Sequence, residues 1–149
     1  GEADAGWGCM YRALMTVVSW YRLQGWTPRG VPGIREIQEL LRERDYAHED
    51  LVVGSKTWIG SQESSLFLNE YLGSDFECRT LHCVDTSDLV AYGPELLAHF
   101  GETGTPVLAG VGQLAYTLVG AAGAGEALQL LVVDPHYQGA EQEEVVLRK

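Results

Sequence analysis

The sequence is poor in cysteine and in basic residues, and it has no long apolar run. Its three cysteines (Cys9, Cys78 and Cys83) are too few and odd in number for a disulfide framework, so a reducing compartment fits best. Ten Lys and Arg residues stand against 21 Asp and Glu residues, giving a net charge of −11. Because the basic residues are also scattered, we expect no surface for nucleic acid or for an anionic membrane. No apolar run approaches the roughly 18 residues of a membrane helix, so no membrane span is expected.

The composition is that of an ordinary globular protein. Of the 149 residues, 46% are hydrophobic and 21% are charged. This mix excludes a disordered tail, a collagen-like rod and a coiled coil. The length corresponds to one domain rather than two, so we expect residues 1–149 to form a single domain with its own core.

The first half of the chain has helical periodicity. Apolar residues recur at helical spacing between Met10 and Tyr21, which predicts a mostly apolar helix that begins at or next to Cys9 and ends near Gly25. The other predicted segments are helices over 34–41 and 66–72 and an irregular loop over 54–61.

The second half changes to β character. The predicted segments are a strand over 76–84, a helix or mixed segment over 89–100, and short β-rich runs over 106–112 and 114–122. A continuous apolar run, Leu128–Val133, predicts a buried strand that ends at Asp134. Helices first and strands later indicate an α+β fold with an antiparallel sheet.

Cys9 is the first candidate for chemistry. A helix N-terminus stabilises the thiolate that a cysteine nucleophile needs, and its free N–H groups can hold a developing oxyanion. The glycines at positions 6 and 8 would let a substrate backbone come close. From position alone, a nucleophile and a small buried apolar side chain are equally good interpretations of Cys9.

His136 is the best candidate for a base to partner the cysteine. It follows the last predicted strand, and Asp134 lies two residues before it, so both side chains can point the same way along an extended segment. Pro135 favours that extended conformation for Asp134. Taken alone, the sequence Asp-Pro-His-Tyr is better explained as a turn after a strand. Together with Cys9 it suggests a Cys–His–Asp set.

Other patterns do not indicate a bound group. Cys78, His82 and Cys83 supply only three ligands at poor spacing, so no zinc site is predicted. No glycine-rich phosphate or dinucleotide motif occurs. Trp58, in the irregular loop, either lines a groove or covers the edge of the core.

Five ordered blocks of this sequence resemble the ubiquitin-fold-modifier-specific cysteine proteases. The blocks are Gly6–Arg12, Val31–Gln38, Gly54–Glu63, Gly104–Val107 and Leu131–Gly139. Autophagy cysteine proteases share the Gly-Trp-Gly-Cys-Met start and the Asp-Pro-His but lack the second and third blocks. The zinc-finger-containing ubiquitin peptidase takes its histidine from the segment where this chain has Tyr116.

The resemblance implies a papain-like fold whose nucleophile heads the central helix. Cys9 is then the nucleophile, His136 the general base and acid, and Asp134 the orienting carboxylate. The resemblance places Trp7, Gly8 and Trp58 at the substrate cleft, and it implies no metal or cofactor. Family members usually carry a histidine where Tyr116 stands, so this chain departs from the pattern there.

The implied activity is maturation of the modifier's precursor and cleavage of its isopeptide bond to proteins, after a C-terminal glycine. An autophagy-type or deubiquitinating protease is the alternative enzyme, and a catalytically inactive adaptor that binds the modifier is the alternative from another class. We expect the papain-like domain to continue past both ends of this chain, since the family's oxyanion tyrosine lies about a dozen residues before the cysteine. The expected location is cytoplasmic, with an adaptor at the endoplasmic reticulum surface.

Overall fold

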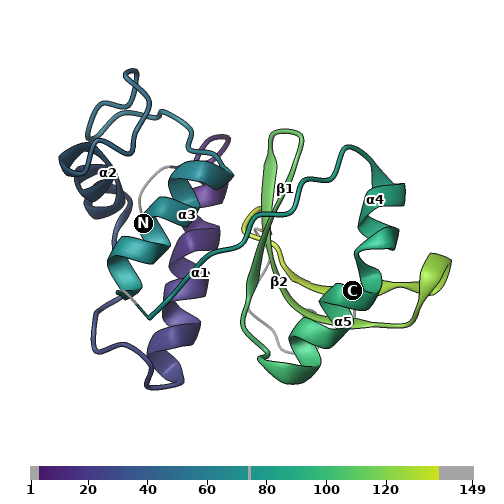
Figure 1. The fold of residues 1–149 in the computed structure, drawn as a ribbon. Coiled ribbons are helices and arrows are strands. Elements are labelled where there is room, and N and C mark those ends of the chain that lie inside the picture. The colour runs from purple at the N-terminus through teal and green to yellow at the C-terminus, as the bar shows by residue number, and fades with distance from the viewer. Residues whose placement is uncertain (1–3, 74, 138–149) are drawn as a thin grey trace.

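The computed structural model describes residues 4–73 and 75–137, which contain helices in the first part and a small sheet in the second (Figure 1). The helices are α1 (Cys9–Leu23), α2 (Ile34–Glu43), α3 (Ser61–Leu72), α4 (Thr86–Ala91), α5 (Gly93–Glu102) and the 3₁₀ turn η1 (Gly125–Ala127). The strands are β1 (Val107–Val111), β2 (Leu114–Ala122) and β3 (Gln129–Val133). Within the described ranges, no helix is long and apolar enough to cross a bilayer.

The sheet is antiparallel in the order β1-β2-β3, which confirms the predicted α+β class. Ala109 pairs with Tyr116, and Thr117 pairs with Val133. Gly112, in the turn between β1 and β2, has a φ of +60°, a conformation that favours glycine.

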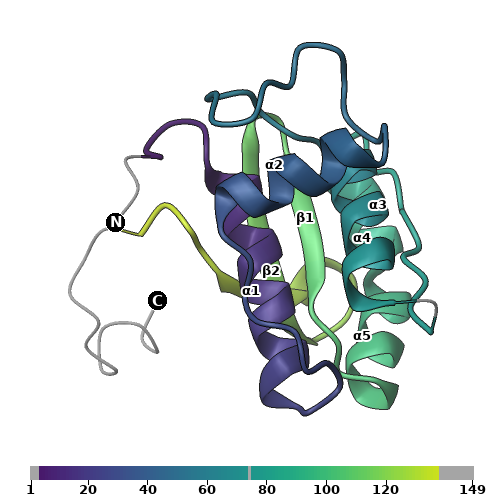
Figure 2. The same cartoon turned by 90° about the vertical axis from the view of Figure 1, so that its left-hand side faces the viewer.

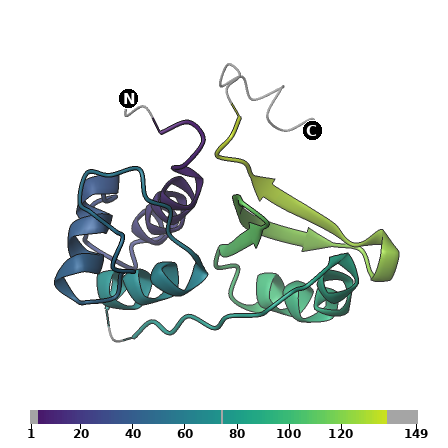
Figure 3. The same ribbon diagram turned by 90° about the horizontal axis from the view of Figure 1, so that it is seen from above.

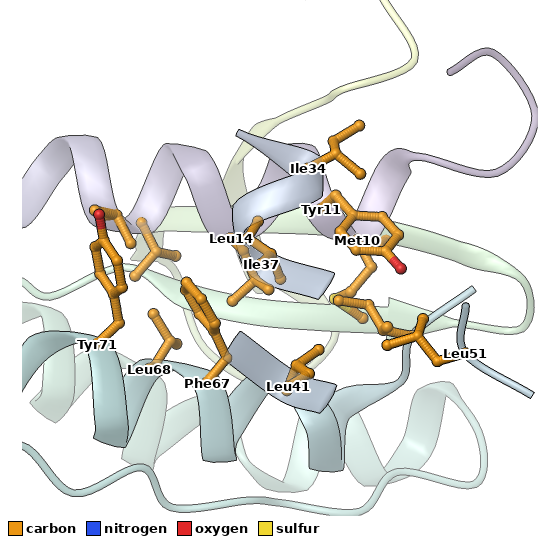
Figure 4. Packing of buried hydrophobic residues seen from close by; sticks show 14 residues of the cluster. Met10, Tyr11, Leu14, Ile34, Ile37, Leu41, Leu51, Phe67, Leu68 and Tyr71 are labelled. Atoms are coloured by element: carbon orange, nitrogen blue, oxygen red, sulfur yellow. The ribbon is translucent and has the colours of Figure 1, made fainter. Parts of the chain in front are cut away.

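The main core lies where α1 meets α2, α3 and the inner face of β2 (Figure 4). The side chains that α1 buries are Met10, Tyr11, Ala13, Leu14, Val17 and Val18. Ala115 of β2 joins this cluster, and Thr117 Oγ1 donates a hydrogen bond of 3.4 Å to Ala13 O. The predicted helix at Cys9 is confirmed as a central helix packed on the sheet.

The predicted strand over Phe76–Val84 is wrong. This segment has no strand pairing and runs as an extended connection from α3 across to α4 (Figures 1 and 3). Its alternating apolar side chains pack on helices instead, with the Phe76 ring 4.9 Å from that of Tyr21. The backbone N–H of Cys78 donates to Asn69 Oδ1 on α3. Alternation indicates extended backbone, but it does not require a neighbouring strand.

The second half also differs from prediction in two smaller respects. The segment 89–100 is helical, divided between α4 and α5 at Tyr92, where Pro94 favours a new helix start. The predicted buried strand at 128–133 is present as β3 but is exposed, with Leu131 60% and Val133 41% accessible. The reason is that, among the described residues, β3 is an edge strand that pairs with β2 alone.

Candidate active site

Cys9 is the first residue of α1, as predicted. The first backbone hydrogen bond of the helix runs from Arg12 N–H to Gly8 O at 3.0 Å, so the N–H groups of the residues between precede the helical ladder. The first turn of α1 has no acidic residue that would compete for the positive end of the helix dipole. The thiol is half-buried, and its Sγ lies 3.8 Å from Gln113 O in the β1–β2 turn. Cys9 thus opens the helix with a partly accessible thiol that donates a weak hydrogen bond to a backbone carbonyl.

A compact loop holds the start of α1 in place. Asp4 O accepts hydrogen bonds from the backbone N–H groups of Trp7 and Gly8, and Asp4 Oδ2 accepts one from Arg12 Nε at 2.5 Å. The Arg12 guanidinium keeps the pKa of the Asp4 carboxyl below its usual value, chiefly through this hydrogen bond. A Cβ at Gly8 would lie only 2.6 Å from Asp4 Cβ, so this packing requires glycine next to Cys9.

Asp134 and His136 meet directly after β3. His136 Nδ1 lies 2.8 Å from Asp134 Oδ1, which also accepts a hydrogen bond of 2.9 Å from the His136 backbone N–H. The segment is not extended through His136, because Tyr137 N–H donates to Asp134 O and closes the turn that was the alternative interpretation of this sequence. The Asp134 side chain thus stabilises the turn and pairs with the His136 ring at the same time, because its Oδ1 contacts both the backbone N–H and the ring of His136.

The short contact with Asp134 favours one tautomer of the neutral His136 ring. An ionised carboxylate only accepts hydrogen bonds, so the proton of the short contact belongs to Nδ1 and leaves Nε2 as the base. The ring of Tyr116, on β2, lies edge-on to the His136 ring with centroids 5.5 Å apart. The His136 ring thus contacts the Asp134 carboxylate through Nδ1 and the Tyr116 ring in an edge-to-face arrangement.

The loop before Cys9 and the segment after β3 leave the body of the molecule on the same side (Figures 2 and 3). A surface hollow of about 400 Å³ is lined by Asp4 from the first segment and by Pro135 from the second, together with Arg12, Met15, Thr16 and Ser19 of α1. Of the Asp-Pro-His turn, Pro135 lines this hollow, whereas Cys9, Asp134 and His136 are not among its lining residues.

The predicted cleft residues have different surroundings. Trp58 is 45% exposed, and its loop is tied to α1 because Tyr11 Oη donates to Thr57 O at 2.8 Å. Trp7 packs edge-on to Tyr11 at 5.7 Å, and its Nε1 is buried with no hydrogen-bond partner in the described parts of the chain. That substrate contacts Trp7, Gly8 and Trp58 stays a prediction.

Gln38 is a positioning residue that the sequence reasoning missed. Its side chain is fully buried, with Nε2 donating to Ser55 O and to Tyr11 Oη and Oε1 accepting from Gly54 N–H at 2.7 Å. It therefore links α2 to α1 and to the loop that carries Trp58. The available signal was its place on the apolar stripe of α2, where a polar residue needs internal partners.

The other cysteines do not share this setting. Burial raises the pKa of the Cys78 thiol, and Cys83 is exposed in the connection before α4. Among residues 4–73 and 75–137, no three His, Cys, Asp or Glu side chains gather as metal ligands.

Comparison with known proteins agrees with this architecture. The family model of peptidase family C78 matches residues 1–149. Ufm1-specific protease 2 of Rattus norvegicus is 44% identical over 149 residues, covering 98% of this chain and 32% of the rat protein. The Ufm1-specific protease of Caenorhabditis elegans is 41% identical over 152 residues, covering 100% of this chain and 25% of the worm protein. The crystal structure of UfSP from C. elegans superposes with a TM-score of 0.80 at 38% identity, over 98% of this chain and 26% of that one.

The fold is therefore of the papain-like α+β class, with the cysteine at the head of the central helix. The chain belongs to peptidase family C78. It spans about a third or less of the length of the relatives it matches.

Proposed function

We propose that this chain carries the catalytic centre of a cysteine peptidase that acts on Ufm1. The observation that carries the proposal is the pair of His136 Nδ1 and Asp134 Oδ1, 2.8 Å apart, on the side of the fold where Cys9 opens α1. The relatives named Ufm1-specific protease, about 40% identical to this chain, support Ufm1 as the substrate.

The mechanism follows from these groups. His136 Nε2 takes the proton of Cys9, and the thiolate attacks the carbonyl carbon of the last glycine that remains on the modifier. The backbone N–H of Cys9 stabilises the oxyanion. The C–N bond breaks as His136 returns the proton to the leaving amine, and a thioester forms. Water, deprotonated by His136, then hydrolyses the thioester and restores the thiol.

The leaving amine determines the biological reaction. If it belongs to residues beyond the glycine, the reaction matures the Ufm1 precursor. If it is a lysine Nζ of another protein, the reaction releases Ufm1 from a conjugate. Both reactions use the same residues, because only the group on the amine side of the scissile bond differs.

The substrate class is tested with three probes that carry a C-terminal electrophile on Ufm1, ubiquitin or an autophagy modifier. We expect an adduct with the Ufm1 probe alone and its loss in Cys9→Ala. An adduct with another probe would assign the chain to an autophagy-type or deubiquitinating activity. Binding of Ufm1 by a folded protein without any adduct would indicate an inactive adaptor.

The location of the whole protein stays a prediction. A cytoplasmic protein with an adaptor at the endoplasmic reticulum surface is expected from the family resemblance. Fractionation of cells that express the full-length protein, with proximity labelling from its C-terminus, tests this expectation. Labelling confined to cytosolic proteins would contradict the adaptor.

A further inference from the structure

Four aromatic rings gather at the end of α1 that lies away from Cys9. Trp20 and Tyr21 come from the last turns of the helix, Trp26 follows the turn at its end, and Phe76 comes from the connection after α3. The Tyr21 ring lies 4.9 Å from Phe76, 5.1 Å from Trp20 and 6.0 Å from Trp26. With its 15 residues, α1 is about 22 Å long, so this group is well separated from the candidate active site.

Three of these rings, those of Tyr21, Trp26 and Phe76, line an open hollow rather than a closed core. The aromatic hollow, defined by Tyr21, Trp26, Asp75, Phe76 and Glu77, has a volume of about 370 Å³. The Trp26 side chain is 58% exposed, which is unusual for a residue of this size. The hollow therefore presents aromatic surface to solvent.

Two carboxylates stand beside the rings. Asp75 and Glu77 are exposed, and neither forms an ion pair with another residue of the ranges 4–73 and 75–137. The negative end of the α1 dipole points toward the same region. Arg22, the basic residue of the last helical turn, is not among the residues that line the hollow. Aromatic rings beside exposed carboxylates complement a cation.

We propose that the aromatic hollow binds a lysine or arginine side chain from a basic segment of a protein partner. The rings contact the aliphatic stem and attract the charge, and Asp75 and Glu77 accept hydrogen bonds from its N–H groups. The overall charge of −11 favours the approach of a basic segment. This interaction surface is independent of the peptidase chemistry at the other end of α1.

The test is an NMR titration of the whole ¹⁵N-labelled chain with three capped tripeptides, Gly-Lys-Gly, Gly-Arg-Gly and Gly-norleucine-Gly. We expect saturable shifts of the Trp26 indole N–H with the lysine and arginine peptides and none with the norleucine peptide. The double variant Asp75→Asn/Glu77→Gln is expected to bind about two- to five-fold more weakly, and added salt should weaken binding further.

Three results would overturn the proposal. These are no shift with either cationic peptide, an equal response to norleucine, or unchanged affinity in the double variant. Because both substitutions are on the surface, the variant should keep the wild-type Tm. Failure here would leave the Ufm1 probe assay unaffected, so the two proposals are tested separately.

Discussion

Asp134 Oδ1 accepts hydrogen bonds from both the Nδ1 and the backbone N–H of His136, at 2.8 Å and 2.9 Å. One carboxylate oxygen thereby fixes the ring, its tautomer and the turn that carries it. The Asp134 side chain is 48% exposed and the His136 side chain is 34% exposed, so their contact is open to solvent. The pairing therefore orients the ring more than it stabilises the fold.

Replacing this carboxylate should impair catalysis with little effect on folding. In Asp134→Asn the amide can donate to Nδ1 and stabilise the tautomer that lacks a base at Nε2. We expect kcat/KM for a Ufm1 fusion substrate to fall by about 10²- to 10⁴-fold. Asp45→Asn is the matched control, because Asp45 has a φ of +56°, a conformation that Asn also tolerates. Wild-type turnover in Asp134→Asn would exclude the orienting role.

The contact between Tyr116 and His136 predicts a smaller effect. An edge-to-face pair contributes about 0.5–1.5 kcal/mol, so Tyr116→Ala should lower kcat/KM by about two- to ten-fold. Tyr116→Phe keeps the ring and should retain activity. Steady-state kinetics of the two variants distinguish a ring contact from a hydroxyl contribution. If Phe is as impaired as Ala, the hydroxyl is the active part and the ring argument is wrong.

Gly8→Ala should displace the loop that holds Cys9. The new Cβ would lie 2.6 Å from Asp4 Cβ and 2.7 Å from Asp4 Oδ2, so one side of the contact must move. A shift of about 1 Å at the nucleophile lowers turnover by about 10²-fold. The matched substitution Gly101→Ala, in α5 with nothing within 4 Å of the new Cβ, should leave turnover unchanged. Equal turnover in the two variants would contradict the proposed packing.

The Asp4–Arg12 pair predicts a pH dependence of stability. Arg12 lowers the pKa of Asp4 in the folded state, so the unfolded chain takes up the proton first as the pH falls. The contribution is full above the unfolded value of about 3.9 and is lost as the pH falls through the folded pKa. Thermal melts of wild type and Asp4→Asn should therefore differ most above about pH 4 and converge below it. A constant difference in Tm across this range would rule out the ion pair as the cause.

Gln38→Leu should destabilise the fold and release the Trp58 loop. It removes the partners of Gly54 N–H and Ser55 O, at a cost of about 2–3 kcal/mol, or about 4–12 °C in Tm. Gln62→Leu, at an exposed position of α3, controls for the added apolar side chain. Calorimetry of the two variants gives the comparison. A Tm of Gln38→Leu within about 1 °C of that of the control would show that the network does not hold the loop.

The sequence predicted those features that depend on local pattern. Helical spacing and the Gly-Trp-Gly turn located Cys9 at the start of α1, and the apolar runs located the three strands. Contacts between residues far apart in the sequence were harder to predict. That Arg12 reaches back to Asp4, or that Gln38 joins two helices and a loop, depends on how the elements pack.

The errors have the same origin. Phe76 and Cys78 alternate with polar residues as in a strand, but tertiary packing places them against helices. The apolar run in β3 predicted burial, but burial depends on which element covers the strand and not on the run itself. For the Asp-Pro-His segment both interpretations hold in part, because the segment forms a turn and the side chain of Asp134 pairs with His136 within it.

The most direct test of the central claim is to locate the adduct that the Ufm1 probe forms with the wild-type chain. The three cysteines lie on three different tryptic peptides, 1–12, 57–79 and 80–148, so peptide mass spectrometry assigns the modified residue without mutation. The account predicts the adduct on peptide 1–12, which carries Cys9. An adduct on either of the other two peptides would contradict it.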